Sequence, residues 1–184
     1  MIIELHNAIF VHIPKNAGNS IVKCFSFPAI SYFHPQHDTV YDIKRQFPKL
    51  YKKWRKFAIV RNPYDRMVSW YFFTKENPED VLEKERVNNI PFNEWIKKSE
   101  FSYNGHKWLY KPQYTWVDDT VNILKFESLN SDINSFLNTK LELPHLTKTN
   151  REHYLLYYDK DSLNIVYDKY KEDFKKYDYE KLEL

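Results

Sequence analysis

Residues 8–23 read AIFVHIPKNAGNSIVK, and this stretch decides the fold class of the chain. It begins with an apolar run of the kind found in a strand that is buried on both faces. A turn containing Gly18 follows, and the apolar residues after Ser20 are spaced as in a helix. The order of buried strand, tight turn and helix predicts an α/β protein with a potential anion site at the turn.

A second segment of the same kind lies at residues 57–71, which read FAIVRNPYDRMVSWY. Its first four residues predict a short buried strand. Asn62 suits the N-cap of the helix that follows, and Pro63 suits the first helical position. The chain therefore repeats the order of strand, turn and helix.

The remaining pattern extends this alternation along the chain. Residues 40–47 predict a helix that Pro48 should end or bend. Residues 121–126 predict a third strand, and residues 92–96, 133–137 and 161–179 predict helices. We therefore expect one α/β domain over residues 1–184, with a central parallel β-sheet and helices on both faces.

Composition excludes several classes of protein. Hydrophobic residues make up 42% of the 184 residues and aromatic residues 18%, which excludes a disordered chain. No apolar run approaches the roughly 18 residues that a membrane span needs, and the first residues lack the features of a signal peptide. Cys24 is the only cysteine, and no Asn-x-Ser/Thr acceptor for glycosylation occurs. These features predict a cytoplasmic protein with no membrane span.

The first turn has the residues of a phosphate cradle. The N–H groups at a helix start point at one spot, where the helix dipole also favours negative charge. Lys15 adds a full positive charge, Gly18 lets the backbone approach an anion, and Ser20 offers a hydroxyl. An ordinary strand-to-helix turn is the alternative, because the lysine precedes the glycine instead of following it as in nucleoside triphosphatases.

The second turn offers another anion site. Arg61 stands at the carboxyl end of its predicted strand, which in a parallel sheet is the edge where the first turn also lies. Ser69 follows two helical turns later, off the predicted core face. A guanidinium and a hydroxyl together suit a phosphate. The alternative is that Arg61 is a surface arginine and Ser69 an ordinary helical residue, with no ligand to bind.

The two segments together resemble a known family. The loop HIPKNAGNS is similar to the 5′-phosphosulfate loop of sulfotransferases that use 3′-phosphoadenosine 5′-phosphosulfate (PAPS). Residues 57–71 resemble the 3′-phosphate motif of the same enzymes, in particular of the carbohydrate-type families. The resemblance covers nearly the whole chain, with residues 77–111 matching least. It implies a P-loop-like nucleotide-binding fold and a sulfotransferase that acts on an acceptor hydroxyl, expected to be that of a saccharide.

The resemblance also implies roles for individual residues. Arg61 and Ser69 would hold the 3′-phosphate, and adenosine 3′,5′-bisphosphate would be the product. Family loops often read PKTGGTS, so this chain departs from the pattern at three loop positions. The residues that would hold the 5′-phosphosulfate are Pro14, Lys15, Asn16, Ala17, Gly18, Asn19 and Ser20.

Chemistry assigns the catalytic roles. Lys15 and backbone amides can neutralise the leaving phosphate oxygen, so no metal is expected. The acceptor hydroxyl needs a base, and we assign this role to His37, which we place at the start of a helix. His34 and a nearby carboxylate remain alternatives, and so does a merely capping role for His37. A zinc site on His34 and His37 is not expected, because no second ligand cluster exists to complete it.

Two other functions remain open. A P-loop kinase would need a lysine after the glycine and an acidic metal ligand, and neither is visible. A polyanion or nucleic-acid binding module could use the basic residues between Lys44 and Lys56, although nucleic acid is not the expected partner. Acceptor specificity is expected in residues 26–36 and 99–116, at the carboxyl edge of the sheet.

Overall fold

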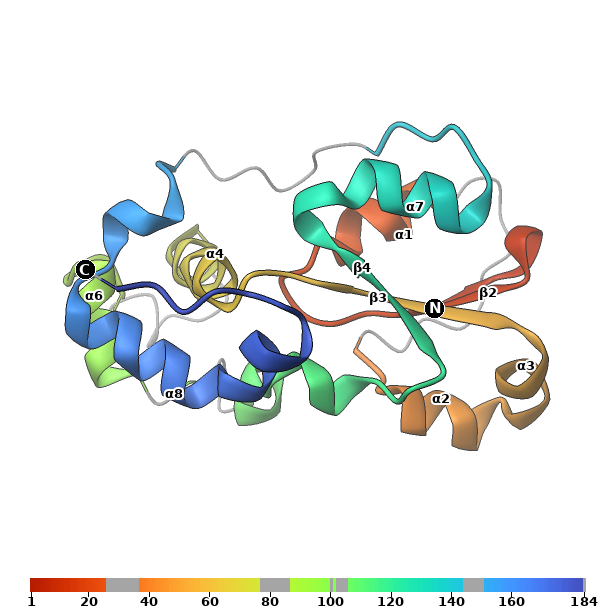
Figure 1. The fold of residues 1–184 in the computed structure, drawn as a ribbon, viewed down its shortest axis with the longest axis horizontal. Coiled ribbons are helices and arrows are strands. Elements are labelled where there is room, and N and C mark those ends of the chain that lie inside the picture. The colour runs from red at the N-terminus through yellow and green to blue at the C-terminus, as the bar shows by residue number, and fades with distance from the viewer. Residues whose placement is uncertain (26–36, 77–86, 100, 102–105, 144–150, 184) are drawn as a thin grey trace. The chain divides into compact units, whose positions relative to one another are not determined.

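The computed structural model describes residues 1–25, 37–76, 87–99, 101, 106–143 and 151–183 (Figure 1). The chain divides into two units. The sheet unit comprises Met1–Arg61 with Gln113–Lys148, and the helical unit comprises Asn62–Pro112 with Thr149–Leu184. The expectation of a single domain over residues 1–184 stays a prediction.

The sheet unit contains a four-stranded sheet in the order β1-β2-β3-β4. The strands are β1 (Ile2–Ile3), β2 (Ala8–Val11), β3 (Arg55–Val60) and β4 (Val121–Lys125). The pairs β2–β3 and β3–β4 are parallel, as predicted from the sequence, whereas β1 pairs with β2 in the antiparallel sense. With two residues, β1 is too short to show the alternation by which a strand is predicted.

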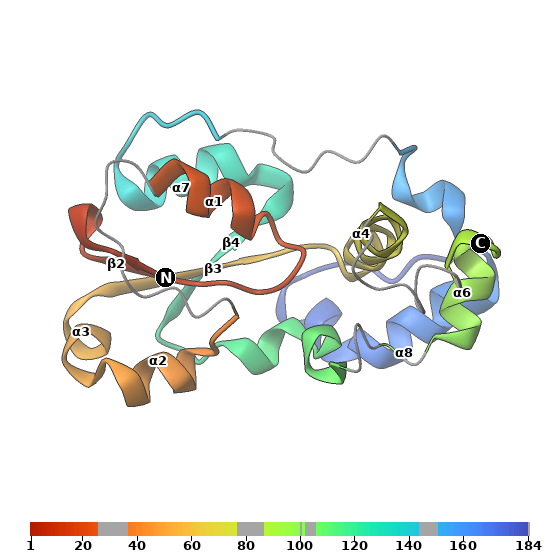
Figure 2. The same cartoon turned by 180° about the vertical axis from the view of Figure 1, so that it is seen from behind.

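Helices cover both faces of this sheet (Figures 1 and 2). On one face lie α1 (Gly18–Phe25) and α7 (Leu129–Leu137), and on the other lie α2 (Val40–Gln46) and α3 (Pro48–Lys53). All four residues of β2 are fully buried, which is why that strand is a continuous apolar run. The mixed α/β fold predicted from the sequence is confirmed. The core on the α1 and α7 side includes Ile3, Phe10, Ile21, Phe57, Ile59, Leu124, Ile133 and Leu137.

The boundary between α2 and α3 follows from local sequence. The hydroxyl of Thr39 accepts a bond from the Asp42 N–H, and the Asp42 carboxylate accepts one from the Thr39 N–H, which forms a capping box. Helix α2 ends at Gln46. Pro48 occupies the first turn of α3, where its missing N–H costs nothing. The break that Pro48 predicted is therefore confirmed.

Among its described residues, the helical unit contains three longer helices, together with the short 3₁₀ segments Lys107–Tyr110 and Tyr154–Tyr157. The helices are α4 (Pro63–Glu76), α6 (Phe92–Lys98) and α8 (Lys160–Lys176). The Asn62 side chain accepts a hydrogen bond from the Tyr64 N–H at 2.9 Å, so the predicted N-cap is confirmed. No helix among the described residues is both long and apolar enough to cross a membrane. The core of this unit includes Tyr64, Met67, Val68, Trp95, Leu163, Val166, Tyr170 and Phe174.

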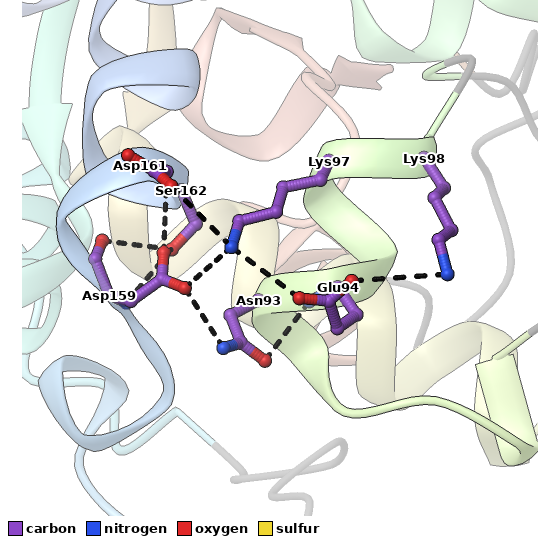
Figure 3. Close-up of polar contacts among 7 residues, drawn as sticks. All are labelled: Asn93, Glu94, Lys97, Lys98, Asp159, Asp161 and Ser162. Atoms are coloured by element: carbon purple, nitrogen blue, oxygen red, sulfur yellow. Dashed lines mark hydrogen bonds and ion pairs between the residues drawn. The ribbon is translucent and has the colours of Figure 1, made fainter.

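One polar cluster ties α6 to the start of α8 (Figure 3). The Asp159 carboxylate caps α8 by accepting from the Ser162 N–H at 2.8 Å. It also accepts from Lys97 Nζ at 2.8 Å and from Asn93 Nδ2 at 3.0 Å, both on α6. A single carboxylate therefore begins one helix and holds a second helix against it.

Candidate functional site

The predicted phosphate loop, residues 14–20, joins β2 to α1 in the sheet unit. Lys15 and Ala17 adopt positive φ angles of 69° and 60°. The Ser20 N–H donates to the Ala17 carbonyl at 3.0 Å, which closes the first turn of α1. The N–H groups of Gly18 and Asn19 begin the same helix, where the first N–H groups have no carbonyl of an earlier turn to accept their hydrogen bonds. The loop therefore has the backbone form of an anion cradle, with Lys15 half-buried beside it.

Gly18 is required by a neighbouring side chain. A Cβ atom at this position would overlap the imidazole of His12, which is 6% exposed. From the sequence we expected the glycine to admit an anion, and we assigned no contact with His12 to it. The structure adds a second reason for the glycine, namely that the His12 ring fills the space beside its Cα.

His37 lies next to His12. Its Nδ1 is 3.2 Å from the His12 carbonyl oxygen, and the two ring centroids are 4.4 Å apart. Its φ of 72° lies in the left-handed region. We expected His37 to start the following helix, with a capping role as the alternative. Both are wrong, because α2 begins at Val40 and its N-cap is Thr39. A chain of contacts thus leads from the loop at Gly18 through His12 to His37.

Arg61 follows the last residue of β3. Its Nη1 donates to the Lys15 carbonyl at 3.0 Å, and its guanidinium lies 3.9 Å from the centroid of the Phe126 ring. The two strand-end turns therefore meet at the same edge of the sheet, as the parallel pairing predicted. Stacking on Phe126, at the end of β4, holds the guanidinium plane in place. A guanidinium has five N–H donors, so a bond to Lys15 is compatible with binding a phosphate.

Sequence reasoning missed Gln113, which begins a short 3₁₀ segment (Gln113–Trp116) and is fully buried. Its side-chain oxygen accepts from Asn16 Nδ2 at 2.6 Å and from the Arg61 N–H at 2.9 Å. Its Nε2 donates to the Arg61 carbonyl at 2.9 Å. A buried glutamine in a stretch without periodicity leaves no pattern from which it could be found.

The other predicted site residues are placed as follows. Ser20 is buried in the first turn of α1, and Asn19 is exposed. Ser69 is half-buried on α4 of the helical unit, and its sharing of a phosphate with Arg61 stays a prediction. His34, and the loop at residues 26–36 expected to select the acceptor, lie outside the described residues.

Part of the basic run between Lys44 and Lys56 has a structural role. Lys56 is buried, and its Nζ donates to the carbonyls of Tyr51 and Trp54 at 2.8 and 3.1 Å. Arg55 donates to the Phe136 carbonyl and lies over the Phe136 ring. The run is therefore not a uniform basic face, which weakens the interpretation of it as a polyanion site.

Comparison with known proteins bears on the whole chain. No curated protein matches it significantly. A family profile described as the sulfotransferase family matches residues 1–180, which is nearly the full length. The chain therefore belongs to the sulfotransferase family, an enzyme family whose membership implies PAPS as the sulfuryl donor.

Proposed function

We propose that this enzyme transfers the sulfuryl group of PAPS to a hydroxyl of a saccharide acceptor. The observation that carries the donor site is the meeting of the two strand-end turns, where the Arg61 guanidinium donates to the Lys15 carbonyl. It brings a lysine, an arginine and a helix start to one edge of a parallel sheet, which is where α/β proteins bind ligands. Family membership supports the same donor.

The residues of the two turns fit a nucleotide that carries two anionic groups. Residues 14–20 would hold the 5′-phosphosulfate through Lys15 and the first-turn amides of α1. Arg61 and Ser69 would hold the 3′-phosphate, which takes no part in the reaction. Bound PAPS supplies the sulfuryl group that is transferred.

Lys15 has the catalytic role on the donor side. Negative charge develops on the phosphate oxygen that leaves when the sulfuryl group departs, and an ammonium beside that oxygen stabilises it. A sulfuryl group carries less charge than a phosphoryl group, so a lysine with backbone amides can serve without Mg²⁺. We propose a reaction that needs no metal.

His37 is the proposed general base. A carbonyl oxygen only accepts hydrogen bonds, so the 3.2 Å contact with His12 requires the proton on Nδ1 of His37. In the neutral ring Nε2 then carries a lone pair, which can accept the proton of an acceptor hydroxyl. The contact with His12, whose ring abuts Gly18, supports a position for His37 beside the phosphosulfate loop.

A thermal-shift comparison tests the proposed function. Adenosine 3′,5′-bisphosphate at a large excess over its dissociation constant should raise the melting temperature in the presence of EDTA. Mg-ATP and an oligonucleotide at the same concentration should raise it much less. Stabilisation by Mg-ATP alone would identify a kinase, and stabilisation by the oligonucleotide alone a nucleic-acid binding module. Transfer of radiolabelled sulfate from PAPS to a panel of saccharides would then identify the acceptor.

A further inference from the structure

Gln113 connects the phosphate loop to the end of β3 through a fully buried amide. The last paired residues of β3 and β4 are Val60 and Lys125. Arg61 is the next residue after Val60. The Gln113 side-chain amide accepts a hydrogen bond from the Arg61 N–H and donates one to the Arg61 carbonyl, both at 2.9 Å. The side chain therefore bonds to Arg61 as a neighbouring strand would, and it prolongs the pairing of β3 by one residue.

The same amide oxygen also holds the phosphate loop. Asn16 Nδ2 donates to Gln113 Oε1 at 2.6 Å and to the Ile59 carbonyl at 2.7 Å. Both partners are acceptors, so the orientation of the Asn16 amide is fixed by its bonds. Gln113 thus joins the backbone of Arg61 to the residue that follows Lys15.

We propose that Gln113 is a positioning residue of the donor site, which sets the separation between Lys15 and Arg61. This inference rests on the proposed function, in which these two side chains hold opposite ends of one nucleotide. The nucleotide has a fixed span between its two phosphate groups, so a small shift of one turn against the other costs affinity. Because the amide is fully buried, its bonds do not compete with water.

Substitution at residue 113 tests the proposal through nucleotide affinity. In Gln113→Ala, the dissociation constant for adenosine 3′,5′-bisphosphate, measured calorimetrically well below the melting temperature, should rise about 10-fold or more. The KM for PAPS should rise more than kcat falls, because Gln113 does not touch the reacting atoms.

Gln113→Glu is the conservative variant. Its carboxylate keeps the acceptor oxygen for Asn16 and for the Arg61 N–H but cannot donate to the Arg61 carbonyl. Protonation restores that donor, and burial favours the protonated form. The affinity of Gln113→Glu, divided by that of the wild type at each pH, should therefore rise as the pH falls. If Gln113→Ala does not fold, the pH dependence of Gln113→Glu tests the positioning role instead.

Asn134→Ala is the matched control. Asn134 is also a side-chain amide with several hydrogen bonds in the sheet unit. Its Nδ2 donates to the carbonyls of Asn130 and Leu141, and its Oδ1 accepts from the Leu141 N–H. It lies near the end of α7, whose Phe136 carbonyl contacts Arg55 at the opposite end of β3. Its loss should lower the melting temperature and leave nucleotide affinity unchanged.

The outcomes are distinct. Weaker binding in Gln113→Ala with unchanged binding in Asn134→Ala supports the positioning role. Wild-type affinity in both Gln113 variants overturns it, while the proposed function stands. Absence of binding by the wild-type protein overturns the proposed function and this inference together.

Discussion

Gly18 illustrates how a single residue shapes the phosphate loop, because the His12 imidazole fills the space where a Cβ would lie. Gly18→Ala should therefore displace the ring or the loop and lower the free energy of unfolding by about 1–3 kcal/mol. Removing the ring in Gly18→Ala/His12→Ala should recover part of this loss. Urea unfolding of the four proteins in the cycle measures the coupling energy. Strictly additive losses would contradict a direct clash.

Lys15 and Arg61 should respond differently to substitution, although both contact the proposed nucleotide. Lys15→Met keeps most of the side chain and removes the charge that acts on the leaving oxygen, so turnover should fall on the order of 10²-fold or more. Arg61→Lys keeps the charge and loses the stacking on Phe126 and the planar geometry. It should weaken nucleotide binding and leave kcat within about 10-fold. Steady-state kinetics separate the two, and an unchanged kcat in Lys15→Met would refute the assigned role.

His37 has a positive φ, which influences the choice of variant. Asparagine tolerates this backbone region and cannot act as a base, so His37→Asn avoids the strain that alanine would add. Turnover should fall about 10²–10⁴-fold with nucleotide affinity nearly unchanged. His153→Ala, at an exposed histidine of the helical unit, is the control. Full activity in His37→Asn would transfer the role of base to His34 or to a carboxylate.

At the scale of elements, Asp159 stabilises the start of α8 in two ways, as a cap and as the partner of Lys97 (Figure 3). Asp159→Ala removes both and should cost about 1 kcal/mol or more of stability. Asp159→Asn keeps a good cap and loses only the charge, so it should cost less. Asp161→Asn, at a side chain that is 76% exposed, is the control with little expected effect.

The pH dependence of stability tests the charged part of this contact. The Lys97 ammonium, followed by the Ser162 N–H and hydroxyl, holds the pKa of Asp159 well below its ordinary value of 3.8. A lowered folded-state pKa gives stability that is present above the ordinary pKa and is lost as the pH falls through the folded value. The stability difference between wild type and Asp159→Asn should therefore shrink below about pH 4. A difference that stays constant down to pH 2 would show that the charge contributes nothing.

The elements that were predicted well from the sequence are those in which burial imposes either a continuous apolar run or a helical period. β2 and β3 are buried on both faces and the buried side of α8 repeats at helical spacing, so composition and spacing identified them. Contacts between side chains far apart in the sequence leave no such signal. The bonds of Gln113 to Asn16 and Arg61 span 97 and 52 residues, so they emerge only when the chain is folded. The packing of His12 against Gly18 was missed for a related reason, since His12 stands between the apolar run and the loop and its residue type does not show which neighbour the ring contacts.

At the scale of the whole molecule, the sulfotransferase profile spans both units, because it covers residues 1–180. Each unit nevertheless has its own cluster of buried apolar side chains. The chain also passes between the units more than once, since each is assembled from two separate stretches of sequence. When one unit unfolds, the two stretches of the other unit lose the folded chain that connects them. This coupling favours a single cooperative unfolding transition.

A matched pair of core substitutions tests whether the two units unfold together. Ile59 is buried in the cluster of the sheet unit, and Ile96 is buried in that of the helical unit. Replacing either by valine removes one methylene group and should cost about 0.5–1.5 kcal/mol. If the chain is one domain, both variants lower the midpoint of one urea transition that fluorescence and circular dichroism report alike. If the units are independent, two transitions appear, Ile59→Val shifts only one of them and Ile96→Val shifts only the other, and the single-domain prediction is wrong.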